Sequence, residues 1–390
     1  MNFIQELRHL LKKNIRDYGM FIALFIIMLT FSVLTDGAFI SPRNISNLIN
    51  SMGYIAVLAV GMTLVIVIRH IDLSVGFLAG FLGAVAAILL TQFQLNVFLV
   101  IIIVLVLGAV MGLINGILVA NLNIPSFVVG LAGMMIFRGA LLQATTKTGT
   151  IIIPDKTFNA IGNGFIPDIK ILEGYHFLTL IIGGLFILAY VLSEIKSRKT
   201  KLTYNFEVVS QPIFILRLIF VSLIIGYITR ILSMYNGLSW TVVIVIIIVA
   251  IYHFMCNKTI LGRYIYAVGG NPEAAALSGI DVKKITYFVF ASMSMLAALS
   301  GILYTSRLQS ATTTAGTLFE LDAIAAAYVG GVSAAGGVGK VTGSIIGALV
   351  MASLTSGMNL MGVGTSYQYI IRGGILLIAV IFDVLTRNKK

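Results

Sequence analysis

Charged side chains are scarce in this sequence, and cysteine is almost absent. Only 10% of the 390 residues are charged and 59% are hydrophobic, whereas an ordinary soluble domain is roughly 25% charged. Because a water-facing surface needs charge, the composition excludes a soluble fold, and the apolar excess must face lipid. The single cysteine, Cys256, permits no internal disulfide, and four scattered histidines are too few for a metal cluster. The sequence therefore indicates an integral membrane protein.

The apolar residues fall into up to twelve runs of about the length that a spanning helix needs, roughly 20 residues. The first run resembles a signal sequence, but no small-residue cleavage site follows Leu34, and we interpret it as an uncleaved span. The expected fold is all-α and polytopic, one transmembrane domain over residues 1–390 with about 10 to 12 helices. The polar stretch 69–74 and the Gly/Ala-rich stretch 329–343 leave the count open, because either can be re-entrant. The runs lie at about 19–34, 50–68, 73–92, 97–121, 124–145, 177–193, 213–232, 238–256, 285–304, 322–339, 341–362 and 367–387.

The net charge of +12 is distributed in short basic clusters between the apolar runs. This distribution is typical of the positive-inside rule and differs from the continuous patch of a nucleic-acid-binding surface. It predicts that both termini are cytoplasmic, together with residues 194–212 and 257–284, and that the loop at about 146–176 lies outside. Glycines recur at four-residue spacing, as in Gly112 and Gly116, which favours close helix packing within one subunit over a dedicated dimer seam.

Residues 271–279 carry the signals of a short helix in a polar stretch. Asn271 is a favoured N-cap, Pro272 suits the first helical position, Glu273 complements the helix dipole, and Gly279 suits the terminating left-handed position. We predict a helix of about two turns that lies along the cytoplasmic membrane surface, because it is too short to be stable alone and too polar to span. Its small, alanine-rich face suits docking into a groove of another protein, but a plain connector explains the pattern equally well.

The same stretch resembles a known family. Glu273-Ala274-Ala275 followed by Gly279 is similar to the Glu-Ala-Ala...Gly loop of the permease subunits of bacterial binding-protein-dependent ABC importers, and within these to the ribose, xylose and multiple-monosaccharide permeases. The resemblance extends over almost the whole chain. It is carried by Thr35-Asp36-Gly37-Ala38, Ser41-Pro42-Arg43-Asn44, Ile71-Asp72-Leu73-Ser74-Val75-Gly76, Pro125-Ser126-Phe127, Leu131-Ala132-Gly133, Phe137-Arg138-Gly139 and Glu320-Leu321-Asp322-Ala323-Ile324-Ala325.

The resemblance implies that 257–284 is a cytoplasmic coupling loop, whose helix docks on the ATPase subunit. Glu273 would orient or pair at that interface, Ala274 and Ala275 would permit close approach, and Gly279 would set the exit turn. His70 departs from the family pattern, because many relatives carry a glutamate there. Residues 194–240 look like an insertion relative to the ribose-type permeases, adding a basic loop and a pair of spans. The ATPase-coupling residues are expected to be Arg263, Asn271, Pro272, Glu273, Ala274, Ala275 and Gly279.

Polar side chains inside or between the apolar runs are candidates for the translocation path, because charges at membrane depth are costly and usually face a cavity or a partner. Asp72 and Ser74 would line or gate the path, although a short cytoplasmic turn in which one of them caps the next helix is favoured by the topology. Arg138 is expected to pair with an acidic side chain or with backbone carbonyls. The candidates are Asp72, Ser74, Asn115, Ser126, Arg138, Glu320 and Asp322.

Enzymatic functions find no support. Gly336-Gly337-Val338-Gly339-Lys340 resembles a phosphate loop, but Val341 replaces the required Ser or Thr and Ala334 stands in place of the first glycine. The chain is therefore not expected to hydrolyse ATP or to bind a cofactor of its own, and no metal site is expected. ATP and Mg²⁺ would bind to the partner ATPase subunits.

The resemblance thus implies a multi-pass permease in the bacterial plasma (inner) membrane that imports a monosaccharide, either xylose or several pentoses and hexoses. It would act as a homodimer with cytoplasmic ATP-binding subunits and a periplasmic or surface-anchored sugar-binding protein. Nucleosides, a signalling furanose or branched-chain amino acids are alternative substrates within the superfamily. A secondary transporter or channel that needs no ATPase is the alternative from another class, and it should show inverted hydropathy repeats.

Overall fold

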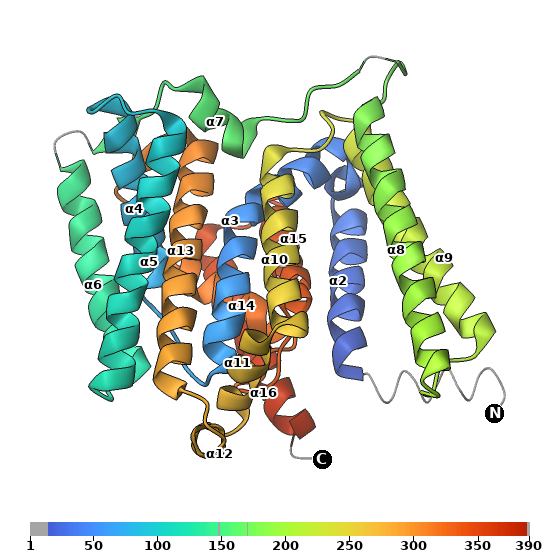
Figure 1. The fold of residues 1–390 in the computed structure, drawn as a ribbon. Coiled ribbons are helices and arrows are strands. Elements are labelled where there is room, and N and C mark those ends of the chain that lie inside the picture. The colour runs from blue at the N-terminus through green and yellow to red at the C-terminus, as the bar shows by residue number, and fades with distance from the viewer. Residues whose placement is uncertain (1–14, 147–148, 170, 388–390) are drawn as a thin grey trace.

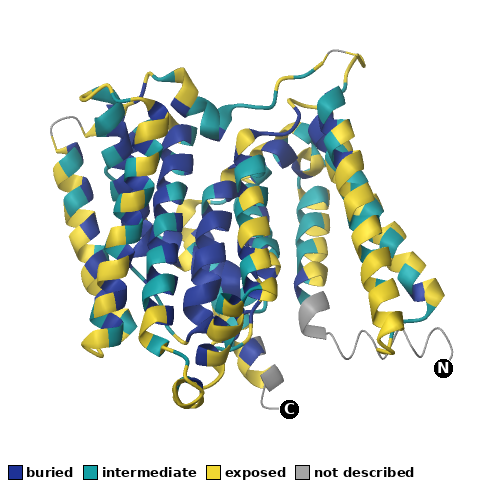
Figure 2. Cartoon of the chain, in the orientation of Figure 1, coloured by how far each residue is buried: buried dark blue, intermediate teal, exposed yellow. Residues whose placement is uncertain are grey.

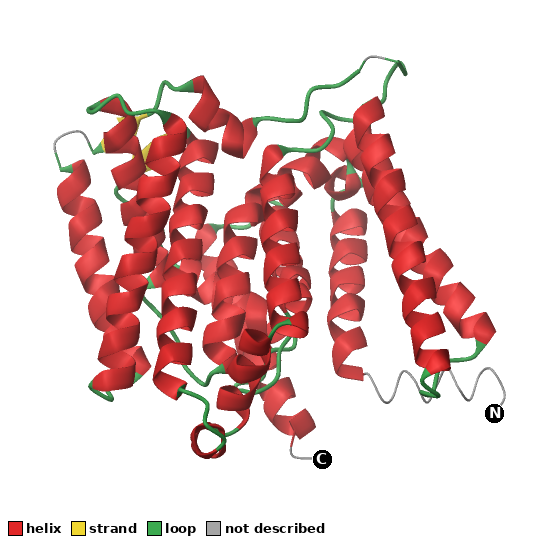
Figure 3. Ribbon diagram, viewed as in Figure 1, coloured by secondary structure: helices red, strands yellow, loops and turns green. Residues whose placement is uncertain are grey.

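The computed structural model describes residues 15–146, 149–169 and 171–387, and helices dominate it (Figures 1 and 3). Two short strands, β1 (Thr150–Ile152) and β2 (Ser310–Thr312), and a short 3₁₀ helix, η1 (Ala38–Ile40), accompany them. The helices are α2 (Ile15–Leu34), α3 (Pro42–Val67), α4 (Val75–Thr91), α5 (Val97–Asn121), α6 (Ser126–Thr145), α7 (Lys156–Asn163), α8 (Phe177–Thr203), α9 (Gln211–Ser233), α10 (Trp240–Lys258), α11 (Ile260–Gly270), α12 (Pro272–Leu277), α13 (Val282–Leu308), α14 (Phe319–Val329), α15 (Val341–Leu360) and α16 (Thr365–Arg387).

The long helices coincide with apolar runs, but α3 begins at Pro42, well before the run 50–68, and α8 ends at Thr203, well after the run 177–193. Among the described residues, nine helices are long and apolar enough to cross a membrane, and the shorter apolar helices Gly19–Leu34 and Val75–Thr91 stand beside them. The polytopic all-α prediction is therefore confirmed. Figure 1 shows α11 and α12 at one end of the bundle, together with the start of α2 and the end of α16, whereas α7 lies at the opposite end. We call these the α12 end and the α7 end.

The apolar run 322–339, of which 329–343 was left open as re-entrant, does not form one spanning helix. Helix α14 covers only Phe319–Val329, 11 residues, and an irregular segment joins it to α15. The physical reason is the glycine content of this segment, since Gly331, Gly336 and Gly337 adopt left-handed φ angles that a helix does not contain. Hydropathy alone does not separate such a segment from a helix, because its other residues are mostly Ala and Val.

The most buried helices, α3 and α13, lie at the centre of the bundle, and the outer helices expose their apolar side chains (Figure 2). Helices α5 and α13 pack closely because glycines on α5 face the backbone of α13. A Cβ at Gly112 would lie 2.2 Å from the Phe290 carbonyl oxygen, and a Cβ at Gly108 would lie 2.6 Å from that of Ser294. These contacts lie within one subunit, as predicted from the glycine spacing.

Helices α8 and α9 form a hairpin at the edge of the bundle (Figure 1), and they contain most of the segment 194–240. The two helices pack mainly on each other, and α9 also contacts α3. At the α12 end, the Arg217 guanidinium pairs with the Glu194 carboxylate at 2.7 Å. That this hairpin is an insertion stays a prediction, although its peripheral position is compatible with one.

The predicted external loop, 146–176, lies at the α7 end. Its strand β1 pairs antiparallel with β2, with Ile151 opposite Ala311. Further along, Asp168 binds the start of α8, accepting hydrogen bonds from the backbone N–H groups of Leu178 (3.0 Å) and Phe177 (3.2 Å). Desolvation raises the pKa of Asp168, but these hydrogen bonds outweigh it and hold the pKa below its ordinary value.

Candidate functional site

The predicted coupling helix, α12, forms as its local sequence predicts. The Asn271 side chain accepts hydrogen bonds from the backbone N–H groups of Glu273 (3.0 Å) and Ala274 (3.1 Å), and Pro272 stands at the first helical position. Gly279 follows with φ of 82°, a left-handed angle that glycine adopts without steric cost. The N-cap and the glycine stop thus define a helix of six residues, Pro272–Leu277.

One face of α12 projects away from the bundle. Glu273, Ala274 and Ala276 are exposed, and Leu277 is 91% exposed, whereas Ala275 is buried. Ala275 thus lets α12 approach its own chain rather than another protein. Leu277 was not among the predicted coupling residues, because its exposure depends on how α12 sits on α11 and α13. An exposed leucine beside a carboxylate gives this face the mixed apolar and polar character of a protein-docking surface.

Helix α11 carries α12 and is amphipathic. Gly262, Ile265 and Val268 are buried, whereas Arg263 and Tyr264 face outward. Arg263 is therefore exposed at the α12 end, as a coupling residue needs to be. Below α12, Asp281 caps α13 and pairs with Lys284 at 3.3 Å. The hydrogen bond that Asp281 accepts from the backbone N–H of Lys284 is the main cause of its lowered pKa.

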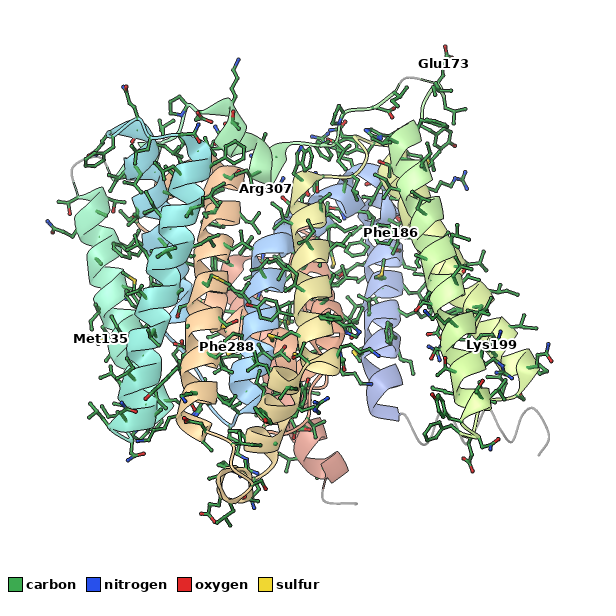
Figure 4. The ribbon with its side chains drawn as sticks, viewed as in Figure 1. Met135, Glu173, Phe186, Lys199, Phe288 and Arg307 are labelled. Carbon is green, nitrogen blue, oxygen red and sulfur yellow. The ribbon has the colours of Figure 1, made fainter. Side chains whose placement is uncertain are left out.

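A cavity of about 610 Å³ lies in the half of the bundle near the α7 end. It is lined by the first part of α3, Arg307 near the end of α13, the start of α14, the second half of α15 and the start of α16. Figure 4 labels Arg307. Its polar lining consists of Asn44, Asn47, Ser51, Tyr54, Arg307, Thr317, Asp322, Thr355, Ser356, Asn359, Tyr369 and Arg372. A cavity of this size with several amide and hydroxyl groups suits a small polyhydroxylated ligand.

A partly buried ion pair stands in the wall of this cavity. The Arg372 guanidinium lies 3.2 Å from the Asp322 carboxylate and donates a second hydrogen bond to the Thr355 hydroxyl at 2.8 Å. The pair joins α14, α15 and α16, and it places one predicted path residue, Asp322, on the cavity. Because each charge neutralises the other, the lining carries no strong field of one sign from this pair.

Aromatic rings form another part of the wall. The Tyr54 and Phe319 ring centroids are 4.7 Å apart, and Tyr304 lies at 5.1 Å from Tyr54. Tyr54 and Phe319 both line the cavity. Aromatic faces beside hydrogen-bonding groups match the two kinds of surface that a sugar ring presents, its C–H face and its hydroxyl rim.

Sequence reasoning missed most of the cavity residues. Arg372 lies within the apolar run 367–387. A charge inside an apolar run is the signal that identified Arg138, and the same signal could have identified Arg372. Asn44 stood in a family motif, but nothing local to its sequence shows that its side chain accepts a hydrogen bond from Ser356, 312 positions away. The meeting of α3, α15 and α16 decides these contacts.

Asp72, Ser74 and Asn115 form a separate buried cluster. One Asp72 oxygen accepts hydrogen bonds from the backbone N–H of Ser74 (2.9 Å) and from its hydroxyl (2.6 Å), and the Asn115 amide lies 3.4 Å from that hydroxyl. Asp72 and Ser74 are fully buried, and neither lines the cavity. Their turn lies directly before α4, but the Ser74 side chain makes no cap hydrogen bond to that helix, and Asp72 binds Ser74 itself.

The remaining path candidates lie apart from the cavity. The Ser126 hydroxyl accepts a hydrogen bond from the backbone N–H of Ile71 at 3.3 Å, and Glu320 is buried with its carboxylate against Gly76. The expected partner of Arg138 was wrong: among the described residues no acidic side chain or carbonyl binds it, and its guanidinium instead lies over the Phe77 ring, 5.5 Å from the centroid. The path assignment of these residues stays a prediction.

Comparison with known proteins agrees with this geometry. Residues 44–380 match the family described as the permease component of branched-chain amino acid transport systems. The chain is 41% identical to the xylose transport system permease protein of Haemophilus influenzae over 97% of this chain and 98% of that protein. It is 40% identical to the corresponding protein of Escherichia coli, over 96% and 93%, and 33% identical to the E. coli ribose import permease protein, over 98% and 97%. No solved structure matches the chain.

The described residues form a bundle of apolar helices with an exposed short helix at one end and a polar cavity near the other, an architecture that suits a membrane permease subunit. The chain belongs to the transport-system permease family that residues 44–380 match, and the resemblance to ABC-importer permeases noted from the sequence is confirmed. The three relatives named above are described as permease proteins. The backbone N–H of Gly337, in the segment that resembles a phosphate loop, donates to the Val67 carbonyl at 2.8 Å.

Proposed function

We propose that this chain imports a monosaccharide of the xylose type, as the permease of an ABC importer. The identity of 41% with a xylose transport system permease protein, sustained over nearly the full length of both chains, carries the proposal. The cavity between α3 and α16 supports it, because its amide and hydroxyl groups suit sugar hydroxyls and its aromatic wall suits a sugar C–H face.

The permease acts as a homodimer with two ATP-binding subunits at the α12 end and an external sugar-binding protein at the α7 end. ATP and Mg²⁺ bind to the ATP-binding subunits, whose closure moves α12 and changes the side to which the cavity opens. The permease binds its substrate weakly, and the external protein supplies most of the selection. The exposed face of α12, with Glu273 and Leu277, supports this role because it offers both charge and apolar surface to a partner.

Basic side chains support a cytoplasmic position for the α12 end. Lys199, labelled in Figure 4, belongs to the cluster at the end of α8, and Lys283 and Lys284 follow α12. A labelling experiment tests this orientation in a Cys256→Ser background. Glu273→Cys should react with a membrane-impermeant maleimide only after the membrane is opened, whereas Glu173→Cys at the α7 end should react in intact cells. The reverse pattern would refute the orientation.

Uptake by proteoliposomes tests the function itself. The chain, its ATP-binding subunit and its binding protein should take up labelled xylose in the presence of internal ATP, and labelled leucine should not enter. Uptake of leucine instead of sugar would favour the branched-chain amino acid alternative. Sugar uptake by the chain alone, driven by a gradient, would show a secondary transporter and refute the ABC mechanism.

Reversal of the charge on the docking helix is a second test. Glu273→Lys should leave the permease folded, because Glu273 is exposed, and should weaken both the association with the ATP-binding subunit and transport. Unaltered co-purification and uptake would contradict the coupling role of α12.

A further inference from the structure

The segment between α14 and α15, residues 330–340, lies at the α12 end and contacts helices that are distant in sequence. We call it the relay loop. It is compact in itself, since the Ser333 backbone N–H donates to the Val338 carbonyl and the Gly336 backbone N–H donates to the Ser333 carbonyl, at 2.9 and 3.0 Å. Internal hydrogen bonds of this kind favour movement of the segment as one cooperative unit.

Helix α11, which directly precedes α12, is hydrogen-bonded to the relay loop. The Tyr266 hydroxyl donates to the Gly339 carbonyl at 2.6 Å. Gly269 lies so close to the loop that a Cβ there would come within 2.8 Å of the Gly337 nitrogen and 1.9 Å of the Val67 carbonyl oxygen. The end of α11, the end of α3 and the relay loop are therefore in direct backbone contact.

Arg69 closes this junction. It follows α3 with φ of 65°, and its Nε donates to the Gly269 carbonyl at 2.7 Å while Nη2 donates to the Gly270 carbonyl. Gly269 and Gly270 end α11, and Asn271, the N-cap of α12, comes next. A charged donor thus holds the last two carbonyls of α11, where the helix dipole favours a cation.

The other side of the relay loop is fastened to α16. The Asp383 carboxylate accepts hydrogen bonds from the Ala334 backbone N–H at 3.0 Å and from the Ser333 hydroxyl at 3.2 Å. Asp383 and Ser333 are both buried. The loop is therefore connected by chain to α14 and α15 and by hydrogen bonds to α16.

These three helices carry the ion pair of the cavity. Asp322 stands on α14, Thr355 on α15 and Arg372 on α16, and the Arg372 guanidinium donates to both of the other side chains. Arg372 is 11 positions from Asp383 along one helix, about 16 Å at 1.5 Å per residue. Because a helix bends little along its axis, a shift of the relay loop would displace the part of α16 that lines the cavity.

We propose that Arg69 and Tyr266 are positioning residues that transmit movement of the coupling helix, through the relay loop, to the helices that carry the Asp322–Arg372 pair. The inference rests on the proposed function, since it requires that an ATP-binding subunit moves α12. The route is a contiguous set of hydrogen bonds and rigid helices, and it needs a test of coupling rather than of contact alone.

Two variants remove the hydrogen bonds of Arg69 and Tyr266 to α11 and the relay loop without changing a residue of α12. Arg69→Asn removes the guanidinium, and asparagine tolerates the left-handed backbone of this position. Tyr266→Phe removes the hydroxyl that donates to the Gly339 carbonyl and that also contacts the Cys256 thiol. Tyr204→Phe is the matched control, because Tyr204 is 70% exposed after α8. Arg69→Lys keeps one charged donor and should restore part of the effect.

The measurement is ATP hydrolysed per xylose imported, in proteoliposomes that contain the permease, its ATP-binding subunit and its binding protein. Arg69→Asn and Tyr266→Phe should each raise this ratio on the order of fivefold, a typical size for lost coupling, with unchanged affinity for the ATP-binding subunit. A wild-type ratio of ATP hydrolysed to xylose imported in both variants would refute the proposal. A wild-type complex without ATP-driven uptake would instead refute the proposed function, and the relay with it.

Amide hydrogen exchange on the purified permease separates coupling from misfolding. Both variants should exchange faster in residues 333–339 and 269–275, while α5 and α13 keep wild-type protection. Protection of the relay loop equal to that of the wild type would show that Arg69 and Tyr266 do not hold it, and would contradict the proposal. Loss of protection across the bundle would assign these residues to general stability and would also contradict it.

Discussion

Leu277 on the coupling helix offers the sharpest test of the docking surface. Its side chain is 91% exposed, so nearly all of it is available for burial against a partner. Leu277→Ala removes three carbon groups, and at about 0.8 kcal/mol for each buried CH₂ the loss reaches about 2.4 kcal/mol when docking buries the whole side chain. This corresponds to roughly a 50-fold weaker Kd for the ATP-binding subunit.

The same substitution should leave the permease intact. A side chain that is 91% exposed contributes almost nothing to the core, and alanine is at least as good a helix former as leucine. The thermal unfolding midpoint of the purified permease is therefore expected to stay unchanged. Any loss of transport would then come from the interface rather than from the fold.

Binding of the purified ATP-binding subunit to the permease in nanodiscs measures the effect. Leu202→Ala is the matched control, because Leu202 is 53% exposed near the end of α8, at the same end of the bundle but on the peripheral hairpin. The control should bind as the wild type does. If Leu277→Ala also kept the wild-type Kd while remaining folded, the exposed face of α12 would not be the docking surface.

Three further outcomes are expected. Gly76→Ala should destabilise the permease by about 1–3 kcal/mol, because the added Cβ would lie 2.1 Å from the Glu320 carboxylate; an unchanged unfolding midpoint would contradict this packing. Asp322→Asn should reduce stability and uptake, by about 1–2 kcal/mol for a pair that is only about a fifth exposed, and adding Arg372→Gln should recover part of the stability; strictly additive losses would argue against the ion pair. The pKa of Asp168 is lowered in the folded protein. The ionised carboxylate therefore stabilises the loop at pH values above the ordinary aspartate pKa, and this stabilisation is lost as the pH falls through the lowered pKa. Asp168→Asn should therefore show at neutral pH the fast amide exchange of residues 165–177 that the wild type shows only in acid, and equal exchange at both pH values would refute this role.

Local features were predicted well because their causes are local. The caps of α12 depend on Asn271, Pro272 and Gly279 within nine consecutive positions, and the structure forms them as expected. The run 322–339 failed for a reason that is also local but invisible to hydropathy, since Ala and Val around glycines are as apolar in a loop as in a helix. Leu277 lay inside a predicted helix, but only the packing of α12 on α11 and α13 decides which residues of that helix face outward.

The sequence by itself indicated the class of the protein, most of its long apolar helices and the short capped helix α12. Hydropathy, capping and charge clusters act over a few turns of chain, and a bilayer leaves few other ways to satisfy the backbone. The tertiary structure alone decided which polar groups meet. Arg69 binds a carbonyl 200 positions away and Arg372 a carboxylate 50 positions away, because such pairings depend on how rigid helices pack, and no short stretch of sequence encodes that.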